Sequence, residues 1–106
     1  MPKYLIQASY TEEGAKGLLR EGGTGRRAAV EQLIRGLGGR LEAFYFAFGG
    51  SDVYLIADLP DNASMVAASL TIAASGAVRP KTTVLLTPEE IDQAAKKTVP
   101  YRPPGE

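Results

Sequence analysis

The stretch that decides the fold is residues 40–62, which read RLEAFYFAFGGSDVYLIADLPDN. Two runs of aromatic and aliphatic residues flank Gly49 and Gly50, and Pro60 ends the second run. This pattern predicts two strands, over 40–48 and 52–59, that pair as an antiparallel hairpin.

Both predicted strands are apolar on both faces, whereas a sheet covered by helices on one side normally has a polar second face. In the first strand, two sets alternate: Leu41, Ala43, Tyr45 and Ala47 against Phe44, Phe46 and Phe48. Only one set can pack on the chain's own helices, and the other would leave an apolar patch that is large for a monomer. We therefore expect the protein to associate with itself, as a homodimer or a higher homo-oligomer.

Upstream of the hairpin, apolar residues alternate over 3–10, as they do in a half-buried strand. Thr11 and the two glutamates that follow it predict the start of a short helix. A second helical run covers 26–37, where apolar residues repeat at the spacing of one helix face. Glycines within 22–25 separate the two runs.

Downstream of the hairpin, Asp61 or Asn62 can cap a helix over 63–74 that is rich in alanine and serine. A fourth strand follows over 78–86. Pro80 removes a ladder hydrogen bond from that strand, which favours an edge position or a bulge.

The C-terminal part begins with Thr87, Pro88 and Glu90, which predict a capping box and a final helix. The whole order is then β-α-β-β-α-β with an added helix, the ferredoxin-like arrangement of the α+β class. We divide the chain into one domain over 1–98 and a proline-rich extended tail over 99–106. A domain this small buries only part of its surface, so association would add stability.

Composition narrows the classes of function. Twelve Lys and Arg balance twelve Asp and Glu, so no net charge favours nucleic acid or an anionic membrane as a partner. The absence of His and Cys removes the usual ligands of transition metals, and we expect no metal and no cofactor. No apolar run approaches the roughly 20 residues of a spanning helix, and the N-terminus lacks a signal-peptide core. We expect a cytoplasmic protein.

Three segments of the sequence resemble the GYD domain: TEEG after the first strand, LGGRLEAFYFAFG before the turn and SDVYLIADLPDNA after it. The resemblance covers about residues 3–90. Gly49 and Asp52 fit the family's Gly, Tyr, Asp signature, while Ser51 stands where the family usually has Tyr. The resemblance implies a ferredoxin-like protomer that pairs sheet to sheet as a dimeric α/β barrel. Proteins of that fold include monooxygenases, isomerases, haem-handling enzymes and ligand-sensing domains, so fold alone assigns no activity.

The segment EGGTGRR, residues 21–27, has two interpretations. Its glycine N–H groups, the following helix start and two arginines could hold an anion. It lacks the lysine and hydroxyl pair of a phosphate-binding loop and follows a helix, not a strand. We favour a flexible break between two helical segments.

A second candidate is a polar cluster of Tyr45, Asp52 and Tyr54 near the hairpin. A phenol and a carboxylate can act as acid and base where burial shifts their pKa values. Alternatively, Asp52 caps the turn and the tyrosines are core residues with one wet end, which we favour.

Two further sets have simple structural explanations. Arg79 and Lys81 share one face of the fourth strand, where they could bind an anionic substrate or guard an exposed edge; we favour the edge. Phe44, Phe46 and Phe48 could stack on bases, but the balanced charge favours packing in a core or an interface.

We therefore expect a mainly apolar pocket between the sheet and the helices or at the mouth of the dimer's barrel. It would be lined by the first-strand face of Tyr4, Ile6, Ala8 and Tyr10 and gated by residues 22–26. Asp52 and Tyr54 would be its polar anchors. The ligand-binding residues that we predict are Tyr4, Arg26, Tyr45, Asp52 and Tyr54. Three functions remain open at this point: a self-associating domain that binds a small, partly apolar molecule, a cofactor-free oxygenase or isomerase, and a purely structural or regulatory oligomer. The sequence assigns no catalytic residue.

Overall fold

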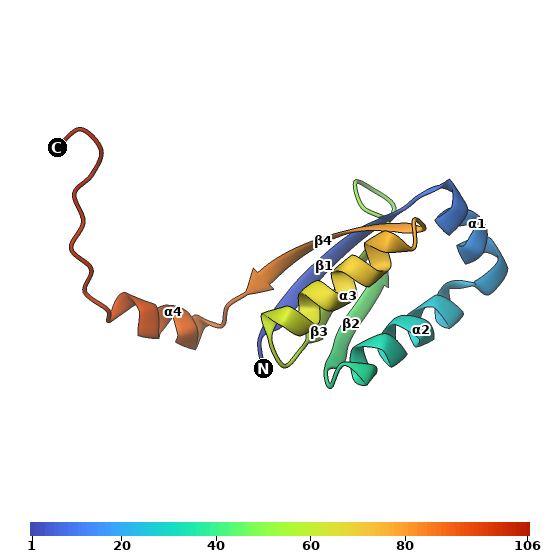
Figure 1. Ribbon diagram of the computed structural model, residues 1–106, viewed down its shortest axis with the longest axis horizontal. Coiled ribbons are helices and arrows are strands. Elements are labelled where there is room, and N and C mark those ends of the chain that lie inside the picture. The colour runs from blue at the N-terminus through green and yellow to red at the C-terminus, as the bar shows by residue number, and fades with distance from the viewer.

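Four strands and four helices make up the computed structural model, which describes all residues from 1 to 106 (Figure 1). In chain order they are β1 (Lys3–Tyr10), α1 (Glu12–Glu21), α2 (Gly23–Gly36), β2 (Arg40–Phe46), β3 (Val53–Asp58), α3 (Asn62–Ala74), β4 (Val78–Leu85) and α4 (Pro88–Ala95). The strands form one antiparallel sheet in the order β2-β3-β1-β4. The predicted ferredoxin-like α+β fold with an additional C-terminal helix is confirmed.

Helices α2 and α3 cover one face of the sheet and leave the other face open (Figure 1). Alternate strand residues point toward these helices and are buried there: Tyr4, Ile6, Ala8, Val53, Leu55 and Ala57. The core is completed by Leu41 of β2, Leu59 after β3, Ile34 of α2, and Met65 and Ala68 of α3. The core therefore lies between the sheet and two helices, while the second sheet face has no cover from its own chain.

A β-bulge in β2 changes which residues share a face. Leu41 pairs with Ala57, but Ala43 pairs with the preceding residue of β3, Ile56, so one extra residue lies between them. The extra residue shifts the alternation of β2 by one position. Leu41 therefore lies on the helix-covered face together with Phe44. The predicted grouping of Leu41 with Ala43 and Tyr45 was wrong, because strict alternation fails at a bulge.

Helix boundaries follow local hydrogen bonding. The Thr11, Asp61 and Thr87 side chains cap α1, α3 and α4, and Thr87 completes the predicted capping box with Glu90. Gly22, with φ 83°, is the single residue between α1 and α2. Such a conformation costs glycine little, so α2 begins already at Gly23, earlier than the predicted start.

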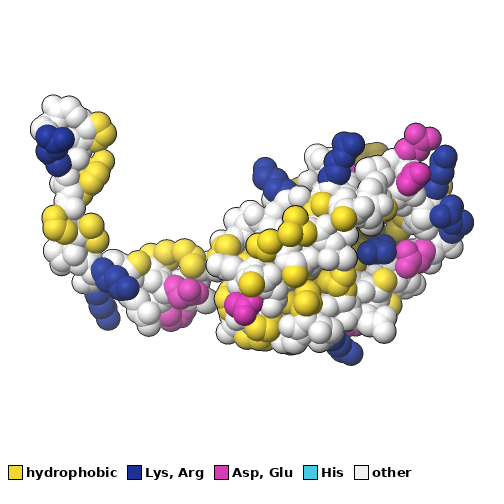
Figure 2. Space-filling model, viewed as in Figure 1, with side chains coloured by type: hydrophobic (Ala, Val, Ile, Leu, Met, Phe, Trp, Pro, Cys, Tyr) yellow, Lys and Arg dark blue, Asp and Glu magenta, His cyan; other side chains and the backbone are white.

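The C-terminal part of the chain projects from the sheet and its helices (Figure 1). Every residue from 86 to 106 is exposed, and the molecule measures 57 × 33 × 24 Å. Hydrophobic side chains lie along this projecting segment (Figure 2), including Ile91, Val99 and Tyr101. We call residues 87–106 the C-terminal arm. None of the helices combines the length and apolarity that crossing a membrane requires.

Candidate functional site

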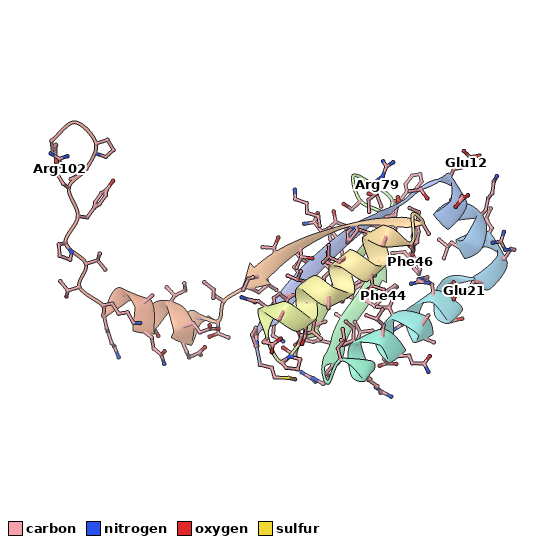
Figure 3. All side chains as sticks on the ribbon, viewed as in Figure 1. Glu12, Glu21, Phe44, Phe46, Arg79 and Arg102 are labelled. Carbon is pink, nitrogen blue, oxygen red and sulfur yellow. The ribbon has the colours of Figure 1, made fainter.

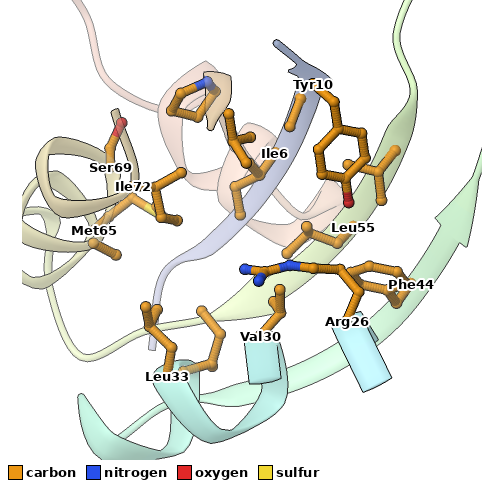
Figure 4. Close-up of a pocket in the computed structure, with 16 residues that line it drawn as sticks. Ile6, Tyr10, Arg26, Val30, Leu33, Phe44, Leu55, Met65, Ser69 and Ile72 are labelled. Atoms are coloured by element: carbon orange, nitrogen blue, oxygen red, sulfur yellow. The ribbon is translucent and has the colours of Figure 1, made fainter. Parts of the chain in front are cut away.

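An apolar cavity lies between the sheet and helices α2 and α3 (Figure 4). Thirteen of its sixteen lining residues are hydrophobic. The sheet contributes Ile6, Ala8, Phe44, Val53, Leu55, Val78 and Pro80, and the helices contribute Val30, Leu33, Ile34, Met65, Ala68 and Ile72. Tyr10, Arg26 and Ser69 add the polar groups.

The sequence builds this cavity in a simple way. Alternation in β1 turns Ile6, Ala8 and Tyr10 toward the helices. The small side chains Ala68 and Ser69 on α3 leave space that larger residues would fill. The enclosed volume is about 50 Å³, well below the roughly 300 Å³ at which small-molecule sites begin. The cavity in this structure is therefore small, and a bound molecule would have to widen it.

Arg26 brings a positive charge to this apolar cavity. It lies at the start of α2, four residues before Val30 and seven before Leu33, so all three share one helix face. Figure 4 shows its side chain reaching across the cavity toward the space between Ile6 and Val30. Its side chain is 30% exposed, and its Nη1 lies 3.8 Å from Oε2 of Glu21.

Tyr10 lies on the opposite wall, with its ring half-buried (Figure 4). Its backbone N–H donates a hydrogen bond of 2.8 Å to Oδ2 of Asp52. Burial raises the pKa of the Tyr10 phenol; Arg26 opposes this shift, while the negative charges of Asp52 and Glu21 add to it. The phenol therefore stays protonated at neutral pH and can donate a hydrogen bond.

Tyr10 and Arg26 also line a second, more open groove along α1. Its other walls carry charged side chains: Glu13, Lys16, Arg20 and Glu21. The two residues thus stand between an apolar interior and a polar surface groove. A molecule with an apolar body and a polar end would find both environments side by side.

The predicted ligand-binding residues occupy four different places, and only Arg26 lines the cavity. The Tyr4 hydroxyl donates a hydrogen bond to Oδ1 of Asn62, and its ring borders a groove between α3 and β4. Tyr45 and Tyr54 are direct cross-strand partners on the open face of the sheet. Asp52 ties the end of the hairpin loop to β1 through Tyr10.

The remaining candidate segments take structural positions. Residues 21–27 form the junction between α1 and α2. Arg79 and Lys81 lie opposite Ser9 and Gln7 on the edge strand β4. Phe44, Phe46 and Phe48 do not form one continuous set, since Phe48 lies outside β2 and is fully exposed.

The other two phenylalanines stay together on the helix-covered side. The rings of Phe44 and Phe46 pack edge to face, with their centroids 5.3 Å apart. Figure 3 labels both residues. Phe46 also approaches the start of α2, where a Cβ added to Gly23 would lie 3.0 Å from its ring.

Sequence reasoning did not single out Glu21 as the partner of Arg26, nor the helix residues of the cavity wall. One signal could have pointed to the α2 residues of the wall: Val30 and Leu33 share the helix face of Arg26, where a charged residue is unexpected. The structure contains no group of three or more His, Cys, Asp or Glu side chains suited to hold a metal ion.

Comparison with known proteins identifies the family of this chain. No curated protein matches this sequence. Among solved structures, the fold is similar to that of the NE2512 protein of unknown function from Nitrosomonas europaea, at 16% identity over 95% of this chain and 96% of that one, with a TM-score of 0.40. The GYD domain model matches residues 4–95. Because that match spans most of the sequence, the chain belongs to the GYD domain family.

Proposed function

We propose that this domain binds a small, mainly apolar molecule in the cavity between the sheet and helices α2 and α3. The observation that carries the proposal is the composition of the cavity wall: hydrophobic side chains from both layers, with polar groups confined to Tyr10, Arg26 and Ser69. Sites for small molecules commonly combine an apolar wall with a few polar groups that orient the ligand.

We further propose that the domain works as an assembly of two or more copies. The open sheet face carries Leu5, Ile56 and the exposed pair Tyr45 and Tyr54. The C-terminal arm supports the same idea, because its helix has only 8 residues and isolated helices that short are marginal in water. Contact with a second copy would cover both surfaces.

Binding fits the cavity better than acid–base catalysis does. Its lining contains no carboxylate, imidazole or thiol, and its one phenol has a raised pKa. A general base works best when its pKa lies near the operating pH. An oxygenase or isomerase would therefore have to take its reactivity from the substrate.

The second candidate function is a structural or regulatory assembly without a ligand. The small volume of about 50 Å³ favours it, because a nearly filled interior needs no occupant. The two candidates differ in whether the cavity opens to a molecule of suitable chemistry.

Binding of the neutral fluorescent probe N-phenyl-1-naphthylamine would separate them. We expect Ile72→Ala to widen the cavity and strengthen probe binding, and Ile72→Trp to fill it and abolish binding. Leu70→Ala, on an exposed part of α3 outside this cavity, is the matched control and should leave binding unchanged. Native mass spectrometry of protein from its own host would show the copy number and any retained molecule. Absence of probe binding in every variant and of a retained molecule would favour the ligand-free assembly.

A further inference from the structure

The position of Arg26 says more about the chemistry of the bound molecule. A guanidinium beside apolar side chains loses hydration, and such a charge is normally compensated by a nearby anion. Glu21 supplies one, but at 3.8 Å the two groups are farther apart than in a charge-assisted hydrogen bond of roughly 2.8 Å. The compensation inside this chain is thus incomplete.

The geometry of the pair leaves room for a second anion. Glu21 is the last residue of α1, before the junction at Gly22, and its carboxylate faces Nη1 of Arg26. The Glu21 side chain is 37% exposed and can turn to solvent. Arginine offers five N–H donors in a planar fork that matches a carboxylate, so donors other than those at Nη1 remain for a ligand.

Tyr10 supplies a second polar contact on the facing wall. Its protonated phenol and the Arg26 guanidinium line the same cavity from β1 and α2 (Figure 4). Beyond them, the cavity wall is hydrocarbon from residues such as Leu55, Met65 and Ile72. Cation and hydrogen-bond donor therefore face the same apolar space from two walls.

We propose that the cavity takes a small monocarboxylic acid, with its carboxylate on Arg26 and Tyr10 and its hydrocarbon part between the sheet and helices α2 and α3. This inference rests on the proposed function and names the class of ligand for the same site. The ligand carboxylate becomes the closest anion to Arg26 and competes with Glu21 for its N–H donors. The ligand would thus bind to the positive charge of Arg26, whereas the sequence predicted the negatively charged Asp52 as its anchor.

The test compares hexanoate with hexanamide, which has the same chain length and no charge, by calorimetric titration of the full chain at pH 7. We expect hexanoate to bind at least about tenfold more tightly, the effect of a hydrogen bond to a charged group. Arg26→Gln should remove this preference and keep the affinity for hexanamide. Glu21→Gln should strengthen hexanoate binding severalfold, because a competing carboxylate is gone.

Arg27→Gln is the matched control, since Arg27 pairs with Glu31 along α2 and does not line the cavity. Circular dichroism establishes that each variant is folded before titration. Equal affinity for hexanoate and hexanamide in the natural chain, or an unchanged preference in Arg26→Gln, overturns the inference while leaving an apolar site in place. If hexanoate, hexanamide and N-phenyl-1-naphthylamine all fail to bind, the proposed function itself falls, and the inference with it.

Discussion

The backbone N–H of Tyr10 donates a 2.8 Å hydrogen bond to the carboxylate of Asp52, which joins the end of β1 to the loop that precedes β3. Asp52 also donates its own N–H to the carbonyl of Ala8. The carboxylate therefore holds the wall of the cavity from outside. This position suits a structural support for the Tyr10 side chain.

Asp52→Ala should lower the free energy of unfolding by about 2 kcal/mol, because it leaves the Tyr10 N–H without its charged acceptor. Asp52→Asn keeps an acceptor oxygen and should cost less than about 1 kcal/mol. Urea denaturation measures both changes. Equal stability of Asp52→Ala and the natural chain would show that water replaces the carboxylate at no cost.

Gly14→Ala should be strongly destabilising. A Cβ at this position would lie 1.9 Å from the carbonyl oxygen of Ala77, the same atom that accepts the Thr11 N–H at 3.0 Å. Helix α1 would have to move away from the start of β4, at a cost of about 3 kcal/mol or more. Thermal and urea unfolding should both show the loss.

Gly36→Ala is the control for that change, because a Cβ there meets nothing within 4 Å and its φ is negative. It should be neutral or stabilise the protein by up to about 1 kcal/mol through helix propensity and a less flexible unfolded chain. Similar losses in both variants would mean that helix chemistry, and not the contact with Ala77, decides the effect.

Stability should fall in acid because of Asp58, which pairs with Lys3 at 2.9 Å and with Arg40 at 3.1 Å. Burial raises the pKa of Asp58, but the hydrogen bonds from Lys3 and Arg40 outweigh it and hold that pKa below its usual range. A lowered folded-state pKa adds stability above the unfolded value of about 4, and this contribution is lost as pH falls through the folded value.

Unfolding of the natural chain and of Asp58→Asn, followed between pH 7 and pH 2, checks this. The variant should be less stable at pH 7 and should lose less on acidification. The variant should still lose some stability in acid, since hydrogen bonding from Ser64 also lowers the pKa of Asp61. Parallel curves for the two proteins would assign the acid sensitivity to other carboxylates.

The C-terminal arm should matter for assembly and not for the fold. Its residues are all exposed, and α4 adds nothing to the core cluster. A chain ending at Leu86 should therefore keep the unfolding free energy of its monomer within about 0.5 kcal/mol, as surface changes usually do. We expect its self-association to weaken in sedimentation at several concentrations. An unchanged association constant would mean that the arm has no role in assembly.

Local patterns predicted most of the fold, because each strand and helix carries its own signal. The strand at Lys3–Tyr10 and the caps at Thr11, Asp61 and Thr87 depend on neighbours in sequence only. The bulge after Leu41 does not, since it exists only through the pairing of β2 with β3. No local property of the sequence marks its position.

The site was harder to predict for a related reason. A period of two assigns Tyr54 and Leu55 to opposite faces, but it does not say which face the helices cover. Because the hairpin is apolar on both faces, the sequence left that choice open, and Tyr45 and Tyr54 were placed at the cavity when they lie on the open face. Arg26 was predicted from its place at the end of the glycine-rich segment 22–26, and it does line the cavity.

The open face leads to the last prediction, that Tyr45→Glu produces a monomer. The Tyr45 side chain is 72% exposed and lies directly opposite Tyr54, so the change costs the single chain little. Buried between two copies, a carboxylate at this position would lose its hydration without a partner. Light scattering at micromolar concentration should show an assembly of at least two copies for the natural chain and one copy for the variant. Phe48→Glu, at a fully exposed loop position outside the sheet, is the control and should leave the assembly intact. A natural chain that is already monomeric at this concentration would refute the assembly, and dissociation by both variants would move the interface away from the open face.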